Sequence, residues 1–257
     1  MTKRALLIGI NYYGTNCQLA GCVNDVNNMK VALEHAGYTD FKVLTDAPGG
    51  DASSRPTKAA IIANLQWIVS GANANDHLFV HYSGHGTGTH DWSGDEADRR
   101  DEAWCPVDYS TSGLIIDDHI RSILEPCGAN VMVVSDCCHS GTILDLRFNF
   151  KQTGHYNVAI AQNPKYRNQS NLCLCLSGCL DSQTSADAWE KNVYNKRMQS
   201  QGALTAKFLG IWNRYGAQLT WRKLLKHLWK ELRESGYTQV PQLSASQFLD
   251  LNKKVIL

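Results

Sequence analysis

Long apolar runs are missing from this sequence, and their absence excludes a membrane-spanning helix. No segment approaches the about 18 to 20 consecutive apolar residues that such a helix requires. The apolar stretch near the start, Ala5-Leu6-Leu7-Ile8, is also too short for a secretion signal. Proline is scarce, with 6 among 257 residues, and 43% of the residues are hydrophobic. This composition is typical of a folded protein and excludes a disordered, collagenous or low-complexity chain.

Excess charge of either sign is missing as well. The 25 Lys and Arg residues are balanced by 24 Asp and Glu residues, which leaves a net charge of +1. Such a balance gives no general attraction to nucleic acid or anionic lipid, so we expect neither a nucleic-acid nor a membrane partner. Function must therefore reside in local sites.

The cysteines do not indicate a disulfide-stabilised fold. Their number is nine, which is odd, and a chain of 257 residues is long enough to form a core without covalent staples. Cysteines of this kind are typical of a reducing compartment. We therefore expect free thiols and a cytoplasmic protein.

Short β-rich apolar runs alternate with segments of helical periodicity, which predicts an α/β fold with a mostly parallel sheet. The run 130–135 gives the clearest strand, and 84–112 shows no recognisable element, as expected of a functional or mobile loop. The strand at 77–82 lacks polar alternation, which indicates that helices cover both faces of the sheet. The predicted strands are 4–10, 41–44, 77–82, 130–135 and 172–177, and the predicted helices are 24–36, 57–69, 117–124, 204–215 and 220–235.

Two potentially catalytic residues follow predicted strands. His85 lies in Tyr82-Ser83-Gly84-His85-Gly86, and Cys138 lies in Asp136-Cys137-Cys138-His139-Ser140-Gly141, 53 positions later. The carboxyl ends of parallel strands meet at one edge of a sheet, where open α/β sheets bind ligands. If the two strands are close in the sheet, both side chains face one cleft.

A thiol opposite an imidazole is suited to acyl transfer. The imidazole stabilises the thiolate that attacks a carbonyl and then gives a proton to the leaving amine. The amides of Gly86 and Cys138 could bind the oxyanion that develops. Taken singly, the cysteine could be a small core residue and the histidine a satisfied polar residue. Their joint placement, at a spacing similar to that in caspases, favours catalysis, although the caspase signature Gln-Ala-Cys is absent and no third catalytic residue can be named.

The sequence resembles the metacaspases over nearly its whole length, from about residue 3 to residue 244. The matching motifs occur in the family's order, which makes the resemblance specific. They are Ala5-Leu6-Leu7-Ile8-Gly9-Ile10-Asn11-Tyr12-Tyr13, Leu19-Ala20-Gly21-Cys22-Val23-Asn24-Asp25-Val26, the His85 and Cys138 segments, Asp101-Glu102-Ala103, Asp117-Asp118, and the stretch from Leu176 to Ala188.

This resemblance implies a caspase-like three-layer α/β fold and a cysteine endopeptidase that cuts after Arg or Lys. It divides one domain into a large-subunit region (1–146), an exposed linker (147–171) and a small-subunit region (172–257). The sequence contains no Pro- or Gln-rich segment before the large-subunit region, so we expect no recruitment or inhibition through a prodomain. The family pattern Asp-x-Cys-His-Ser-Gly selects Cys138 over Cys137 as the nucleophile, with His85 as its partner.

The resemblance also implies an acidic specificity pocket at Asp25, Ser83 and Asp136. Two carboxylates in a partly dry pocket favour a guanidinium or an ammonium group. Asp25 could instead interact with the positive end of its helix, and Asp136 could simply end a strand.

The resemblance implies calcium as a cofactor that activates the enzyme, and no organic cofactor is expected. The family's ligands correspond to Asp101, Asp117, Asp118 and Asp145, and carboxylate oxygens suit calcium. The same residues could be solvated carboxylates, with Asp117 or Asp118 as a helix cap. We expect bound calcium to order the 84–112 loop and switch activity.

Basic residues in and beside the linker are candidate self-cleavage sites: Arg147, Lys151, Lys165 and Arg167. Cys173, Cys175 and Cys179 could suggest a metal cluster, but we expect them to pack as small apolar residues. The basic amphipathic helix at 220–235 is interpreted as a solvated outer face over an apolar stripe.

Two rival hypotheses remain. The first is a catalytically silent caspase-like scaffold that binds peptides or protein aggregates. The second is a zinc or redox protein that uses Cys137, Cys138 and His139, although adjacent ligands suit tetrahedral coordination poorly. The main prediction is a monomeric protease whose partners are peptides or proteins with Arg or Lys at the cleavage position.

Overall fold

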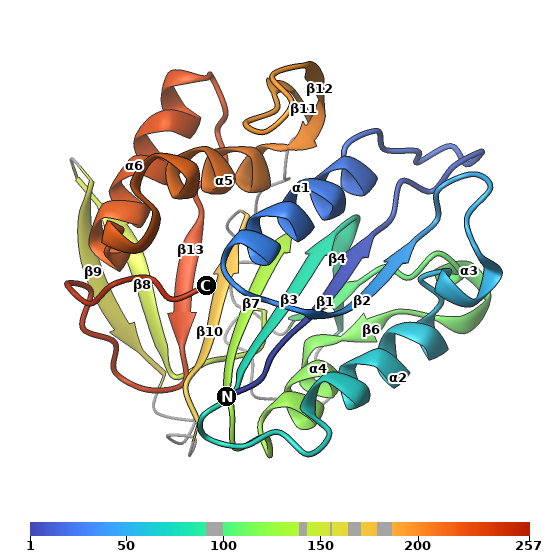
Figure 1. Ribbon diagram of the computed structural model, residues 1–257, viewed down its shortest axis with the longest axis horizontal. Coiled ribbons are helices and arrows are strands. Elements are labelled where there is room, and N and C mark those ends of the chain that lie inside the picture. The colour runs from blue at the N-terminus through green and yellow to red at the C-terminus, as the bar shows by residue number, and fades with distance from the viewer. Residues whose placement is uncertain (91–99, 139–142, 155, 164–170, 179–186) are drawn as a thin grey trace.

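The computed structural model describes residues 1–90, 100–138, 143–154, 156–163, 171–178 and 187–257. Eight of the described strands form one sheet, and helices lie on both of its faces (Figure 1). The strands are β1 (Lys3–Gly9), β2 (Asp40–Thr45), β3 (His77–Ser83), β4 (Gly86–His90), β5 (Arg100–Trp104), β6 (Ile115–Ile116), β7 (Asn130–Asp136), β8 (Phe148–Thr153), β9 (Asn157–Gln162), β10 (Cys173–Ser177), β11 (Asp187–Lys191), β12 (Met198–Gly202) and β13 (Gln242–Ala245).

The sheet has the strand order β2-β1-β3-β7-β10-β13-β8-β9. The first five of these strands are parallel, and β13, β8 and β9 complete the sheet by antiparallel pairing. In the centre, β3 and β7 pair so that Ser83 lies opposite Asp136. The mostly parallel sheet predicted from the sequence is therefore confirmed.

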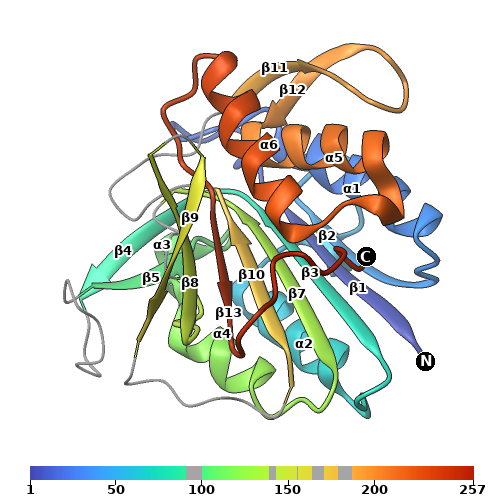
Figure 2. The same cartoon turned by 90° about the vertical axis from the view of Figure 1, so that its left-hand side faces the viewer.

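The helices fall on opposite sides of the sheet, with α1, α5 and α6 on one side and α2 and α4 on the other (Figure 2). Among the described residues, no helix is long and apolar enough to cross a membrane. The helices are α1 (Cys22–His35), α2 (Lys58–Val69), α3 (Tyr109–Ser112), α4 (Asp117–Leu124), α5 (Ala203–Tyr215) and α6 (Trp221–Glu234), with 3₁₀ turns at Ala52–Ser54 and Gly216–Gln218.

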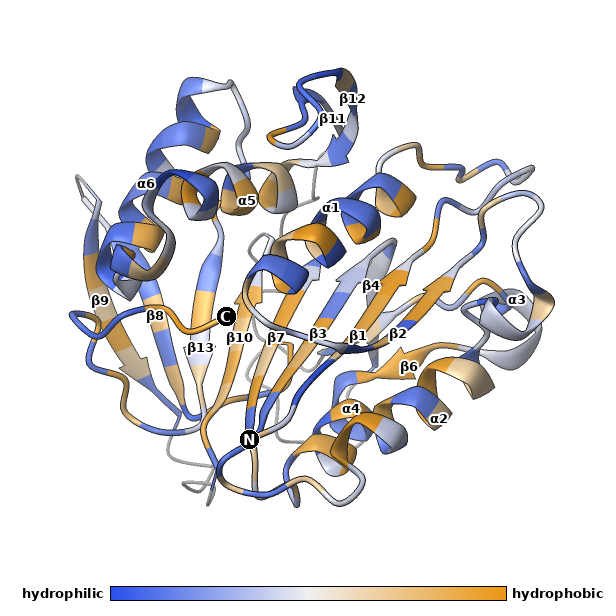
Figure 3. Cartoon of the chain, viewed as in Figure 1, coloured by the Kyte–Doolittle hydropathy of each residue, from blue (hydrophilic) through white to orange (hydrophobic). Residues whose placement is uncertain are grey.

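Alternating side chains of the parallel strands fill two separate cores. In β1, Leu7 packs with α1, α5 and α6, whereas Leu6 and Ile8 pack with α2 and α4. Successive strand residues point to opposite faces, so a strand covered on both faces is apolar at most of its positions. Figure 3 shows mostly apolar colouring along the central strands, with polar residues towards their ends. The covered sheet predicted from the apolar run at 77–82 is confirmed.

Helix α6 illustrates how the local sequence sets an element. Thr220 caps it by accepting a hydrogen bond from the Lys223 amide. Its stripe of Trp221, Leu225, Leu228 and Leu232 is buried, while Arg222, Lys223, Lys226, Lys230 and Arg233 are exposed. The interpretation of a core stripe with a solvated basic face is confirmed.

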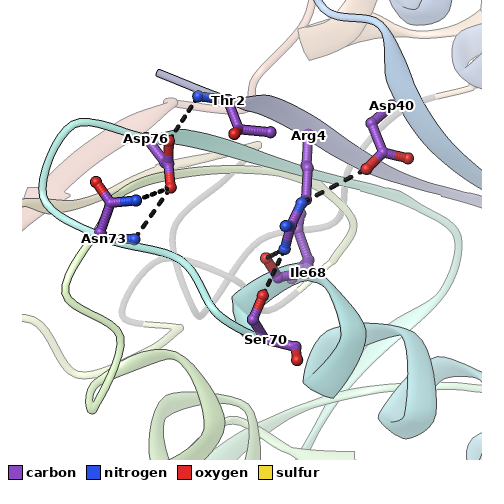
Figure 4. Close-up of polar contacts among 7 residues, drawn as sticks. All are labelled: Thr2, Arg4, Asp40, Ile68, Ser70, Asn73 and Asp76. Carbon is purple, nitrogen blue, oxygen red and sulfur yellow. Dashed lines mark hydrogen bonds and ion pairs between the residues drawn. The ribbon is translucent and has the colours of Figure 1, made fainter.

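Side chains from neighbouring segments hold the start of β1, which lies between β2 and β3 (Figure 4). The Asp76 carboxylate accepts hydrogen bonds from the Thr2 amide at 2.5 Å and from the Asn73 side chain at 2.7 Å. The Arg4 guanidinium donates to the Ser70 carbonyl at 2.7 Å and lies 3.5 Å from the Asp40 carboxylate. These contacts fix the first strand, on which β2 and β3 both pair.

Several described elements differ from the sequence prediction, including the short strand β6. The 84–112 region contains β4, β5 and α3, and the predicted linker 147–171 contains the hairpin of β8 and β9. Strands β11, β12 and β13 were also not predicted. Several of these strands are short, and β9 is largely exposed, so they carry little apolar alternation. Pairing with neighbouring strands stabilises them where local sequence does not.

Candidate active site

The His85 and Cys138 segments lie next to each other at the carboxyl edge of the parallel sheet. Each residue follows, by two positions, one member of the Ser83–Asp136 pair on β3 and β7. A methyl group on Gly86 would lie only 2.2 Å from the Cys138 carbonyl oxygen. The two segments therefore touch through their backbones, and position 86 must be glycine for that approach.

The structure supplies a third group that the sequence could not name. His85 Nε2 lies 2.7 Å from the carbonyl oxygen of Cys17, in the loop after β1. A carbonyl can only accept a hydrogen bond, so Nε2 carries the proton and Nδ1 is left as the basic nitrogen. Sequence motifs miss this group because it belongs to the main chain, which every residue type possesses.

The two adjacent cysteines differ in burial. Cys137 is 1% exposed, packs in the core shared with α2 and α4, and places its sulfur 3.3 Å from the Ser135 hydroxyl. Cys138 is only partly buried. A substrate can reach Cys138 more readily than Cys137, which agrees with the register chosen from the sequence.

The three residues predicted to form a specificity pocket converge. The Ser83 hydroxyl donates to the Asp25 carboxylate at 2.7 Å, and the Gly202 amide donates to the same carboxylate at 2.9 Å. A methyl group on Gly202 would lie 2.2 Å from Asp136 Oδ2 and 2.8 Å from Asp25 Oδ2. Two carboxylates thus flank the glycine at the start of α5.

Helix α5 and a buried histidine hold Asp136. The Thr205 amide and hydroxyl both donate to Asp136 Oδ2 at 2.8 Å, so this carboxylate occupies the positive amino end of α5. His81 Nε2 lies 3.2 Å from the Thr205 hydroxyl oxygen. Because that hydroxyl donates to Asp136, it accepts from His81, which must be the Nε2-protonated tautomer. Burial lowers the pKa of His81 to about 3, so the ring is neutral at ordinary pH.

A second acidic cluster brings together Glu102, Asp117 and Asp145, whose nearest carboxylate oxygens all lie within 4.8 Å of one another. All three residues are buried. Burial first, and then the charges of Asp145 and Glu102, raise the pKa of Asp117 to about 10. The Oδ2 atom of Asp117 is buried without a hydrogen-bond partner among the described residues. Hard oxygen donors and an unsatisfied carboxylate oxygen fit a calcium ion.

The sequence-predicted calcium ligands are only partly gathered there. Asp117 and Asp145 belong to the cluster, whereas Asp101 and Asp118 do not. Asp118 forms an ion pair with Arg121 at 2.5 Å, and Arg121 also lies 3.1 Å from Asp145. Asp101 and Glu102 are successive residues of β5, so their side chains point to opposite faces. Glu102 belongs to the Asp101-Glu102-Ala103 motif but was not predicted to be a calcium ligand. The alternation of side chains along β5 is what distinguishes Glu102 from Asp101 as a candidate ligand.

Of the candidate self-cleavage residues, Lys151 lies in β8, paired with Ala159 of β9, and Arg147 directly precedes β8. Lys165 and Arg167 lie outside the described residues. Among the three cysteines considered for a metal cluster, Cys173 and Cys175 are buried in the core, as predicted, and Cys179 lies outside the described residues.

Comparison with known proteins agrees with this geometry. A family profile described as "Metacaspase, peptidase C14 domain" matches residues 3–147. "Metacaspase-3" of Trypanosoma cruzi is 37% identical over 100% of this chain and 74% of its own length. "Metacaspase-1" of Mycosarcoma maydis is 35% identical over 97% of this chain and 72% of its own. A crystal structure of a Geobacter sulfurreducens protein shares the fold, with a TM-score of 0.69 and 23% identity over 99% of this chain and 97% of that one.

Proposed function

The chain belongs to the metacaspase family of C14 cysteine peptidases, and on this basis we propose that it is a calcium-responsive endopeptidase that cleaves after Arg or Lys. The contact between Gly86 and the Cys138 backbone is the observation that carries this proposal, since it joins the histidine and cysteine segments at one sheet edge. The Cys17 carbonyl adds a second support by orienting the imidazole.

In the proposed reaction, Cys138 attacks the scissile carbonyl as a thiolate. A C–S bond forms, and His85 protonates the amine as the C–N bond breaks. Water then attacks the thioester carbonyl and gives a proton to His85. The C–S bond breaks, the acid product leaves, and His85 returns the proton to the Cys138 sulfur, which restores the thiol. The Cys17 carbonyl holds the ring and stabilises the imidazolium that forms transiently, by accepting a hydrogen bond from its Nε2–H group.

The Gly86 amide is suited to the oxyanion. The Cys105 amide donates to the His85 carbonyl at 3.1 Å, while Gly86 lies opposite Trp104 in the β4–β5 pairing. Gly86 and Trp104 are therefore a non-hydrogen-bonded pair, and the Gly86 N–H points away from β5. We propose that it donates, with the Cys138 amide, to the tetrahedral oxyanion, an interaction worth about 3 kcal/mol per donor.

Asp25 and Asp136 would select a basic side chain at the cleavage position. Both carboxylates are buried, and the Ser83 hydroxyl between them is fixed by its bond to Asp25. An Arg or Lys side chain gains charge-assisted hydrogen bonds there, whereas an acidic side chain is repelled.

Calcium would be held by Asp117, Asp145 and Glu102. The ion would supply positive charge that compensates the three buried carboxylates. The cluster joins β5, which follows the His85 hairpin strand β4, to the start of α4. We propose that this connection couples calcium binding to the catalytic loop.

Peptides that end in Arg, Lys or Asp before a fluorogenic group, assayed with calcium and with chelator, test this proposal. We expect cleavage after Arg and Lys only, stimulated by calcium, and lost in Cys138→Ala but not in Cys137→Ala. Preference for Asp contradicts the pocket assignment, and equal rates with chelator contradict calcium activation. No cleavage under any condition supports a silent scaffold instead.

We also propose that the protein works as a monomer in a reducing compartment such as the cytoplasm. The cysteines that the structure describes are all free thiols, which supports a reducing environment. Light scattering during size-exclusion chromatography tests the monomer, and a mass of twice the 28.6 kDa chain contradicts it.

A further inference from the structure

Tyr12 belongs to a motif that the proposed reaction leaves without a role. It follows β1 in the Asn11-Tyr12-Tyr13 stretch and is 1% exposed. Its backbone φ of 52° lies in the left-handed region, which is rarely adopted by a bulky residue. Backbone strain of this kind persists only where surrounding contacts impose it, and it concentrates at functional sites.

The Tyr12 hydroxyl forms hydrogen bonds with the backbone of both His85 and Cys105. It accepts a hydrogen bond from the His85 amide at 2.9 Å and donates to the Cys105 carbonyl at 2.7 Å. Cys105 itself donates its amide to the His85 carbonyl at 3.1 Å. Tyr12 therefore links β1, the His85 loop and the end of β5.

A second phenol completes the arrangement. Tyr82 donates its hydroxyl proton to the His85 carbonyl at 2.8 Å, and its oxygen lies 3.3 Å from that of Tyr12. Tyr82 is fully buried and stacks on Trp104 at 4.5 Å between ring centroids. The amide and the carbonyl of His85 are thus each held by a tyrosine hydroxyl.

The Tyr12 ring also contacts the imidazole directly. The two ring centroids are 4.7 Å apart at an interplanar angle of 35°. The Cys17 carbonyl holds the Nε2 side of the same imidazole. A methyl group on Gly84 would lie 2.9 Å from the Tyr82 hydroxyl and 3.1 Å from the Tyr12 hydroxyl, so the loop closes on both phenols only because position 84 is glycine.

We propose that Tyr12 is a positioning residue for His85, with Tyr82 as its partner. Tyr12 fixes the amide and limits ring rotation, and Tyr82 fixes the carbonyl, so that the basic nitrogen stays directed at the Cys138 segment. This inference rests on the proposed peptidase function. Neither tyrosine contacts the acidic pocket residues in the hydrogen bonds described, so we expect catalysis, rather than substrate binding, to depend on them.

We call the hydrogen bonds that join the Tyr12 and Tyr82 hydroxyls to the His85 backbone the tyrosine clamp. Tyr12→Phe and Tyr82→Phe test the clamp because each variant deletes a hydroxyl and keeps the ring. Tyr38→Phe is a matched control, since Tyr38 is a buried tyrosine that packs beside Phe79 in the opposite core. We expect Tyr12→Phe to lower kcat about 10- to 100-fold, the scale of loss from misplacing a catalytic group, with KM changed less than about twofold. Tyr82→Phe should also lower kcat, by a smaller factor than Tyr12→Phe. Tyr38→Phe should not change kcat.

A readout other than turnover separates positioning from folding. In protein labelled with ¹⁵N-histidine, the His85 signal, assigned with His85→Gln, should report the Nε2-protonated tautomer. We expect Tyr12→Phe to mix the tautomers and to shift the pH dependence of Cys138 alkylation by iodoacetamide, followed by peptide mass spectrometry. A thermal unfolding midpoint equal to that of Tyr38→Phe shows that the effect is not general destabilisation.

The outcomes distinguish the clamp from the function. If the wild type cleaves and Tyr12→Phe matches Tyr38→Phe in kcat, the clamp is overturned while the peptidase function stands. If the kcat loss is accompanied by an unchanged His85 signal, the positioning role is also overturned. If the wild type cleaves no peptide, the function fails, and the histidine spectra and alkylation profiles still show whether Tyr12 orients His85.

Discussion

The main-chain oxygen of Cys17 lies 2.7 Å from Nε2 of His85. The interaction depends on the path of the loop after β1 and not on the Cys17 side chain. It therefore gives the imidazole a fixed tautomer without a third catalytic side chain. The Cys17 thiol has no role in the proposed reaction, although the carbonyl of the same residue contacts the catalytic histidine.

The first prediction separates that thiol from the nucleophile. Cys17→Ala should keep kcat within about threefold of the wild type, because the carbonyl remains. Cys138→Ala should lower kcat by at least about 10³-fold, as expected when a covalent nucleophile is lost. Steady-state kinetics on an Arg-terminated peptide measure both. A Cys17→Ala loss comparable to that of Cys138→Ala would show that the wrong sulfur has been assigned.

The second prediction concerns Gly202, which lies between the two pocket carboxylates. In Gly202→Ala the added methyl would lie 2.2 Å from Asp136 Oδ2, so the pocket must shift. We expect kcat/KM for Arg peptides to fall at least about 10-fold, mainly through KM. Gly210→Ala, in the helix α5 that Gly202 precedes, is the control, since its methyl meets Val193 at an ordinary 3.9 Å. It should leave kcat/KM unchanged and slightly raise the unfolding temperature. Equal kinetics for the two variants would argue against the pocket.

The third prediction concerns the carboxylate cluster. Without calcium the Asp117 carboxyl is protonated at neutral pH, because its pKa is about 10. Asp117→Asn therefore keeps an uncharged group at this position, and the calcium-free variant should be about as stable as the wild type. Calcium should raise the unfolding temperature of the wild type and fail to raise that of the variant. Glu234→Gln, at an exposed position, is the control.

Glu102 and Asp101 give a sharper form of the same test. Glu102→Gln should weaken calcium binding, measured by titration calorimetry, at least about 10-fold more than Asp101→Asn. The reverse order would support the ligand set implied by family resemblance over the set that the structure brings together.

The fourth prediction is a pH dependence of stability that arises at His81. Its pKa is about 3 in the folded protein because of burial, against 6.5 in an unfolded chain. Below pH 6.5 the unfolded state binds the additional proton, so stability falls as pH falls towards 3. At pH 4.5 this group should cost about 3 kcal/mol. Urea unfolding should therefore depend less on pH between 6.5 and 4.5 in His81→Gln than in the wild type or in His119→Gln, an exposed control. Parallel profiles would remove His81 as the source.

The fifth prediction concerns self-cleavage after Lys151. The preceding residues Asn149 and Phe150 are paired with both β13 and β9, so they are not free to enter an active site as an extended peptide. We expect no cleavage after Lys151 in the folded protein, and Lys151→Ala should leave the fragment pattern unchanged. Mass spectrometry of products that begin at Gln152 would show that the hairpin opens during processing.

The parallel sheet was predictable because its strands are apolar on both faces and follow helices with clear periodicity. The hairpin of β8 and β9 was not, since Phe150 is its main buried apolar residue and β9 is largely exposed. The family resemblance grouped Asp25, Ser83 and Asp136, and the structure brings these residues together, while their role in specificity stays a prediction. The sequence alone could not locate the Cys17 carbonyl, because a main-chain group has no side-chain signature. It also could not choose Glu102 over Asp101, because that choice depends on which face of β5 points towards Asp117 and Asp145.

The ladder between β7 and β10 has a consequence for any nicked form of the protein. Strand β10 pairs with β7 over Cys173–Ser177 and Val131–Ser135, inside cores that both halves of the chain help to fill. Scission between Gln162 and Cys173 would leave two polypeptides joined by this ladder and by the packing around it. They should separate under denaturing electrophoresis and yet elute together from a sizing column as one particle, with no covalent bond between them.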